Sequence, residues 1–195
     1  PVPPSKNPYD IAIATQKTAS AKARMFALEG TFDLTLNKTG PGLKEVLAPV
    51  SDRIESFLAY AYAKRAVDLH KRGINPGISQ ADATYVFNKY DGVSEFKTAA
   101  DGLHQWSNAL LKYWKDAGGL SDEAVKTIRD ANPFYIPLKR IFAGQEVSGA
   151  GGGRGFVNLG SPIKRLKGSG RAIMDPIQAL VQQAENIIAT ADKAR

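Results

Sequence analysis

The chain of 195 residues contains no cysteine, which excludes disulfides, thiolate metal ligands and cysteine nucleophiles together. No run approaches the roughly 18 consecutive apolar residues of a transmembrane helix, and residues 1–10 lack the basic and apolar regions of a signal peptide. Histidine is scarce: His70 and His104 fall on separate predicted helices, and neither has an ExxH or HxxxH partner. We therefore expect no secretion, no membrane span, no cofactor and no metal.

The overall composition is that of a folded domain. Apolar residues make up 43% of the chain and charged residues 23%, and the length suits one domain with a real core. The chain starts without Met and ends inside an amphipathic pattern, IIATADKAR, with no stop signal. We expect a single helical domain over 1–195 that is a fragment of a longer multidomain chain. The alternative is removal of the initiator Met and a helix that reaches the end.

Apolar residues recur at steps of three and four over most of the chain. This spacing predicts helices over 9–28, 43–72, 80–90, 94–117, 121–130 and 176–191. Pro49 inside the second of these predicts a kink, or a helix start near Ser51. The fold class expected is therefore all-α, an irregular multi-helix bundle.

Capping residues and turns support these boundaries. Ser79 and Ser121 are predicted N-caps, and Asp175 followed by proline predicts the start of the last helix. The segment TFDLTLN, 31–37, is predicted to be a loop, with a short extended piece as the alternative. Trp106 and Trp114 share the apolar face of one helix, so we interpret both as core residues; stacking on nucleic-acid bases is the alternative.

One region, 132–176, fits no helix. FYIPLKRIF and GFVNL are β-branched and aromatic, which predicts a short β-hairpin around 134–159. A glycine-rich basic insertion covers 143–172. Its SGAGGGRG sequence lacks the spacing of a phosphate-binding loop, because neither GxxxxGK[ST] nor a strand-linked GxGxxG occurs.

Positive charge is concentrated in the same region. The chain has a formal net charge of +7, and residues 147–174 hold five cations and no acid. We call these residues the cationic strap, and Lys139 and Arg140 would extend it if the hairpin forms. The candidate contact residues are Lys139, Arg140, Arg154, Lys164, Arg165, Lys167 and Arg171.

Two hypotheses follow for the cationic strap. Its cations and glycine amides suit the phosphates of a nucleic acid, or a neighbouring domain. Alternatively the strap packs on the protein itself or across an oligomer interface, paired with acids and helix ends. A third hypothesis, an enzyme with a cryptic carboxylate site, has little support, because pairs such as Asp122 and Glu123 are explained by helix capping. We expect no enzymatic activity and assign no catalytic residue.

Three segments carry a family resemblance. They read NPGIS at 75–79, AGGLSDEAVKTIRDANPFYIPLKRIF at 117–142, and GSPIKRLKGSGRAIMDPIQAL at 160–180. Together they resemble a helical domain of the large polyvalent proteins of bacteriophages and related mobile elements. The resemblance implies a fragment, a location in the phage virion or the bacterial host cytoplasm, and neighbouring domains in one long polypeptide. It brings no catalytic residues with it.

Overall fold

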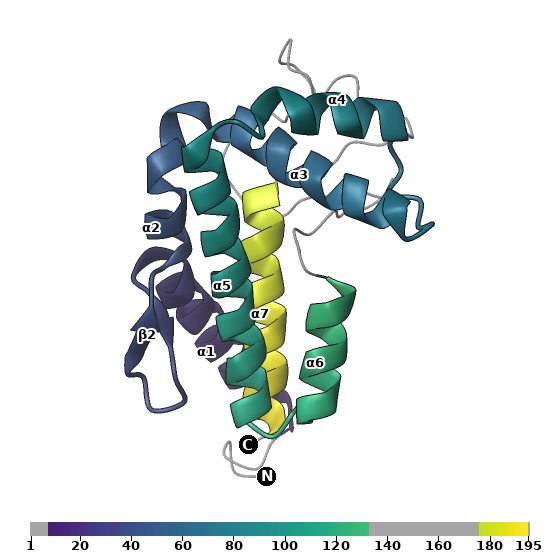
Figure 1. Ribbon diagram of the computed structural model, residues 1–195. Helices are drawn as coiled ribbons and strands as arrows, with labels where there is room; N and C mark the ends of the chain where they lie inside the picture. The colour runs from purple at the N-terminus through teal and green to yellow at the C-terminus, as the bar shows by residue number, and fades with distance from the viewer. Residues whose placement is uncertain (1–7, 133–175, 195) are drawn as a thin grey trace. The chain divides into compact units, whose positions relative to one another are not determined.

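The computed structural model describes residues 8–132 and 176–194 (Figure 1). They form α1 (Pro8–Leu28), α2 (Leu43–Leu47), α3 (Ile54–Lys71), α4 (Gln80–Tyr90), α5 (Ser94–Asp116), α6 (Asp122–Ala131) and α7 (Pro176–Ala194). A 3₁₀ helix, Ala48–Arg53, connects α2 to α3, and strands β1 (Thr31–Phe32) and β2 (Lys38–Gly40) pair as an antiparallel hairpin. The described residues thus form an all-α multi-helix fold, the class that the sequence predicts, with a short hairpin at 31–40.

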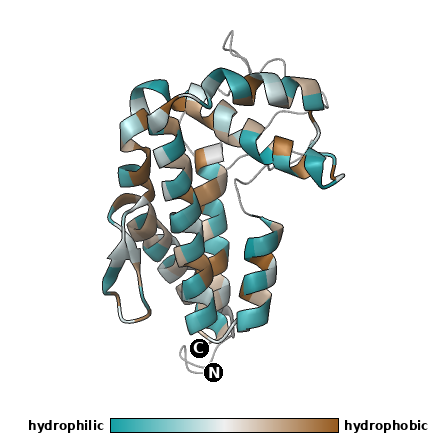
Figure 2. Cartoon of the chain, viewed as in Figure 1, coloured by the Kyte–Doolittle hydropathy of each residue, from teal (hydrophilic) through white to brown (hydrophobic). Residues whose placement is uncertain are grey.

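Most of these helices are amphipathic, with hydrophobic and hydrophilic residues on the same ribbon (Figure 2). In α5, the longest described helix, the buried residues are alternately three and four positions apart, so they all lie on one face of the helix. Every member of this face is at most 6% exposed. The face consists of Phe96, Ala99, Leu103, Trp106, Leu110 and Tyr113, and Ala117 continues it directly after the helix.

The described residues divide into two compact units. Unit 1 consists of 8–48, 102–132 and 181–194, and unit 2 of 49–101 and 176–180. In unit 1, Phe26 packs edge-on against the rings of Phe32 and Tyr113, with centroids 5.8 and 5.6 Å away. The buried indole of Trp106 donates a hydrogen bond of 2.9 Å to the carbonyl oxygen of Phe26. That bond satisfies one of the last carbonyls of α1, which has no partner within the helix.

Unit 2 is built on the α3–α4 hairpin. Asn75 forms the turn by accepting a hydrogen bond from the Gly77 amide at 2.8 Å, and the Ser79 hydroxyl caps α4 by accepting from the Asp82 amide at 3.1 Å. Residues 57–63 are all buried, so α3 is covered on every side there. Phe96 lies at the centre of an aromatic cluster, within 6 Å of the ring centroids of Phe57, Tyr60 and Tyr90.

The segment 31–37, expected to be a loop, is one over 33–37, but its first two residues form strand β1, which pairs with β2 across a tight turn organised by the Asp33 carboxylate. The interruption predicted at Pro49 in the helix over 43–72 is confirmed: α2 ends at Leu47, Pro49, which has no amide hydrogen, lies in the 3₁₀ helix, and α3 begins at Ile54. The predicted caps Ser79 and Ser121 and the core position of Trp106 are confirmed.

Three predictions lie outside the described residues. They are the hairpin around 134–159, the glycine-rich insertion 143–172 and the N-cap Asp175. The last helix does begin at Pro176, the position that the sequence predicts.

Candidate functional site

The predicted contact residues all lie between 133 and 175, outside the described part of the chain. This holds for Lys139, Arg140, Arg154, Lys164, Arg165, Lys167 and Arg171. For these residues the structure gives only indirect evidence, namely the number and pairing of the charged side chains in the described part of the chain.

The charges of the described residues balance. Of the 26 Lys and Arg residues nine lie outside the described ranges, and of the 19 Asp and Glu residues two do. The described residues therefore hold 17 charges of each sign, and the net charge of +7 arises entirely elsewhere, chiefly from 133–175. The helical scaffold is electrically neutral as a whole.

Most described carboxylates already have a partner. Nine lie in ion pairs with Lys or Arg, most of them on exposed helix surfaces. Three more accept hydrogen bonds: Asp33 in the hairpin, Asp82 from Ser79, and Glu185 from Ser20. Each of these carboxylates thus contacts another described residue of the protein itself.

Lys22, Tyr113 and Asp192 form a polar network inside unit 1, on α1, α5 and α7. The Lys22 ammonium donates to both oxygens of Asp192 at 2.8 Å and to the Tyr113 hydroxyl at 3.1 Å. Tyr113 donates to Asp192 at 3.0 Å. Burial disfavours the charged form of Lys22, but the hydrogen bonds with Asp192 and Tyr113 outweigh burial and raise its pKa. A lysine held protonated is no nucleophile, so the network acts as a clamp between helices.

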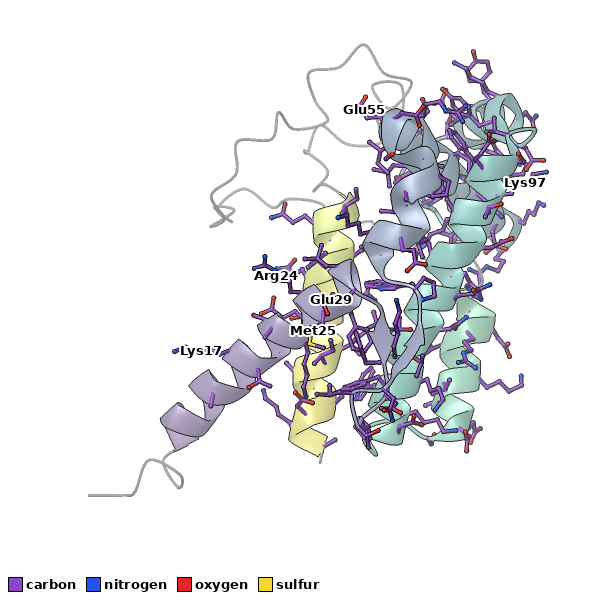
Figure 3. All side chains as sticks on the ribbon, turned by 90° about the vertical axis from the view of Figure 1, so that its left-hand side faces the viewer. Lys17, Arg24, Met25, Glu29, Glu55 and Lys97 are labelled. Carbon is purple, nitrogen blue, oxygen red and sulfur yellow. The ribbon has the colours of Figure 1, made fainter. Side chains whose placement is uncertain are left out.

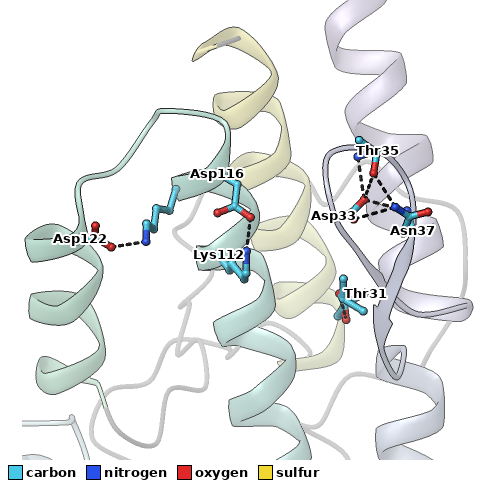
Figure 4. Close-up of polar contacts among 9 residues, drawn as sticks. Thr31, Asp33, Thr35, Asn37, Lys112, Asp116 and Asp122 are labelled. Carbon is cyan, nitrogen blue, oxygen red and sulfur yellow. Dashed lines mark hydrogen bonds and ion pairs between the residues drawn. The ribbon is translucent and has the colours of Figure 1, made fainter.

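The β1–β2 hairpin contains a second polar cluster (Figure 4). Asp33 accepts hydrogen bonds from the amide and hydroxyl of Thr35, both at 2.8 Å, and from the amide of Asn37 at 2.9 Å. The Thr35 hydroxyl and the Asn37 amide lower the pKa of Asp33 to about 2. All the bonds that stabilise this carboxylate come from its own turn, which makes it a structural group.

The α5–α6 hairpin frames an open pocket of about 320 Å³. Gly118 adopts a positive φ of 84° after α5, and the indole of Trp114 covers Gly119 so closely that a Cβ there would collide with it. Ser121 then caps α6 by accepting a hydrogen bond from the Ala124 amide at 3.1 Å. The pocket is lined by Lys112, Lys115, Asp122, Val125, Lys126, Arg129 and Asp130.

The sequence prediction missed this pocket. Its four cations lie on amphipathic helices among acids of similar number, a pattern typical of a solvated helix face. Only the spacing of the cations could have indicated the pocket. Lys112 and Lys115 are three residues apart on α5, and so are Lys126 and Arg129 on α6. Each pair therefore lies on one face of its helix.

The two histidines have no common site. The His70 Nε2 lies 2.9 Å from the Ile78 carbonyl oxygen in unit 2, and His104 belongs to unit 1. Within 8–132 and 176–194 no group of three or more His, Asp or Glu side chains is arranged to hold a metal ion. None of the described helices is long and apolar enough to cross a membrane.

Comparisons with protein-family models, with curated protein sequences and with solved structures give no significant match to this chain. The resemblance to the phage polyvalent proteins therefore depends on the three sequence segments alone.

Proposed function

We propose that this chain is a non-enzymatic helical module of a phage polyvalent or virion-internal protein, and that its cationic strap contacts the phosphates of a nucleic acid. The virion setting rests on the three segments that resemble polyvalent proteins. The phosphate contact rests on one observation, the separation of charge between a neutral scaffold and a strap with five cations and no acid.

That separation favours an external anion over internal pairing. If a strap cation took a carboxylate from the scaffold, the lysine or arginine that held that carboxylate would lose it, and the net charge would stay at +7. The excess can be neutralised by mobile counterions or by an anionic partner, of which a nucleic acid has the highest charge density. A polyanion releases its own condensed counterions on binding, which adds a favourable entropy.

The test is binding to a mixed-sequence DNA duplex at several salt concentrations. Five phosphate contacts predict a slope of about −4 to −5 for the logarithm of affinity against the logarithm of salt, with Kd below about 100 µM at low salt. Neutralising four strap cations should reduce that slope to about −1. The strap variant combines Lys164→Gln, Arg165→Gln, Lys167→Gln and Arg171→Gln.

A matched control removes the same charge from the scaffold. It uses four exposed cations, two of which, Lys17 and Arg24, project from α1 in Figure 3. The control variant combines Lys17→Gln, Arg24→Gln, Lys44→Gln and Lys193→Gln. We expect it to keep most of the affinity, although both variants have the same net charge.

Two results would contradict the proposal. Equal losses in the two variants would mean that only net charge matters. Unchanged DNA affinity in the strap variant, combined with lower thermal stability or an altered oligomeric mass, would instead establish the alternative, a structural or oligomerisation module whose strap packs on the protein.

A further inference from the structure

The α5–α6 pocket gathers four cations around one opening. Lys112 and Lys115 come from α5, and Lys126 and Arg129 from α6, while the lining contains two carboxylates, those of Asp122 and Asp130. The lining therefore has a net charge of +2 in a unit whose described residues are neutral. This local excess attracts anions.

Three of the four cations have a carboxylate partner, and one of these pairs, Lys115 with Asp122 at the start of α6, is well placed. The other two pairs are less favourable. Lys112 pairs with Asp116 and Lys126 with Asp130, in both cases with lysine four residues before aspartate, the less favourable order on a helix. Asp116 is the last residue of α5 and Asp130 the last but one of α6, where the helix dipole opposes a negative charge. Lys126 and Asp130 are also 77% and 63% exposed, so water screens their attraction.

Arg129 is oriented for a ligand. Its Nε donates to the Asn108 side chain at 2.9 Å, which fixes the plane of the guanidinium. Among the described residues its two terminal nitrogens have no hydrogen-bond partner. An arginine held by Nε presents those nitrogens as a fork that fits two oxygens of one oxyanion.

From this geometry we infer that the α5–α6 pocket binds a phosphate-type oxyanion. Arg129 binds two of its oxygens, Lys112, Lys115 and Lys126 neutralise its charge, and Asp116 and Asp130 turn away into solvent. The phosphate group is that of a small free phosphate or that of a nucleic-acid backbone. The site shares no residue with the cationic strap.

The experiment is a titration of the isotope-labelled full chain with pyrophosphate, followed by backbone amide NMR at constant ionic strength. We expect shifts in amides of 108–130, and a loss of affinity of about tenfold in the double variant Lys126→Gln, Arg129→Gln, because the bidentate contact is gone. The control Lys17→Gln, Lys44→Gln removes the same charge from exposed positions of the same unit and should bind like the parent.

A second variant gives an effect of opposite sign. Asp116→Asn with Asp130→Asn removes the competing carboxylates, and should tighten pyrophosphate binding several-fold. A merely structural role for these pairs would not produce tighter binding. Absence of shifts in 108–130, unchanged affinity in the Lys126, Arg129 variant, or no tightening in the carboxylate variant would each overturn the inference.

The strap variant separates this inference from the proposed function and identifies the phosphate source. With the strap neutralised, pyrophosphate should still bind the pocket even if the DNA affinity is lost. Shifts of the same amides by a mixed-sequence oligonucleotide in that variant would assign the pocket to backbone phosphates. Shifts by pyrophosphate alone would assign it to a small phosphate.

Discussion

Unit 1 and unit 2 both bury aromatic rings, but they differ in the polar contacts between their elements. Unit 1 fixes its helices with short, directional contacts: Lys22 to Asp192 at 2.8 Å, and the Trp106 indole to the Phe26 carbonyl at 2.9 Å. Unit 2 relies on ring packing around Phe96, and its phenol hydroxyl contacts are long, 3.3 Å from Tyr60 to Asp91 and 3.5 Å from Tyr90 to Ser56. Unit 2 should therefore respond to lost volume, and unit 1 to a lost partner.

The largest effect should come from Phe96→Ala in unit 2. Removing a ring that touches three others should lower the free energy of unfolding by about 3–5 kcal/mol. Urea unfolding followed by circular dichroism measures the loss. The matched variant Tyr60→Phe keeps the ring and removes only the hydroxyl contact, so it should cost less than about 1 kcal/mol. Equal losses in the two variants would mean that the hydroxyl contacts matter as much as the rings.

The same variant tests whether the units unfold together. Both tryptophans, Trp106 and Trp114, belong to unit 1, so their fluorescence reports on that unit alone. If Phe96→Ala lowers the urea midpoint seen by circular dichroism and leaves that of fluorescence in place, the units unfold separately. Coincident midpoints would show one cooperative transition.

The next effect should come from Asp192→Leu in unit 1. Lys22 would keep its charge at a side chain only 18% exposed, without the carboxylate that balances it. We expect a loss of about 2–3 kcal/mol, below the cost of breaking a fully buried pair. The double variant Lys22→Met, Asp192→Leu removes both charges and should recover much of that loss, which urea unfolding of all three proteins would establish. A double variant as unstable as the single one would contradict a charge mechanism.

The pH dependence of this pair has a definite sign. The pKa of Lys22 is raised on folding above its ordinary value of 10.5, so its stabilising contribution is complete below that value. The contribution is lost as the pH rises through the higher pKa of the folded state. The difference in stability between the parent and the double variant should therefore narrow above pH 10.5.

Local spacing explains why much of the fold is predictable from the sequence. The buried face of α5, including Trp106, is predicted by apolar residues at steps of three and four. The caps Ser79 and Ser121 are predictable because each serine bonds an amide only three residues further along the chain. The pairing of Lys22 with Asp192 joins residues 170 positions apart, and no local pattern encodes it. The cations of the α5–α6 pocket have the right spacing, but only the path of the turn brings the two helices' faces together.

The β1–β2 hairpin was missed for a different reason. Hairpin turns are normally signalled by Asn or Gly at positions of positive φ, and here Leu36 adopts a φ of 64°. Glycine would adopt this φ without steric cost, whereas here the bonds from Thr35 and Asn37 to Asp33 stabilise the turn that contains the strained leucine. The Asp33 side chain thus stabilises a turn that lacks the usual glycine. Patterns based on turn residues such as Asn-Gly therefore do not predict it.

Asp33→Ala should have the smallest effect on global stability, because the residue is only partly buried and lies outside the buried interior of unit 1. We expect faster hydrogen exchange at the Thr35 and Asn37 amides, and a smaller shift of the urea midpoint than in Asp192→Leu.

In the parent protein Asp33 should titrate at about 2 instead of 3.8. Its contribution is then present above pH 3.8 and is lost as the pH falls through 2. Titration of the Asp33 carboxyl by NMR checks this. An Asp33 midpoint near 3.8 would mean that the turn does not hold the carboxylate. An Asp33→Ala loss as large as that of Asp192→Leu would mean that polar contacts stabilise unit 1 whether or not they are buried, which would remove burial as the cause of the difference between the units.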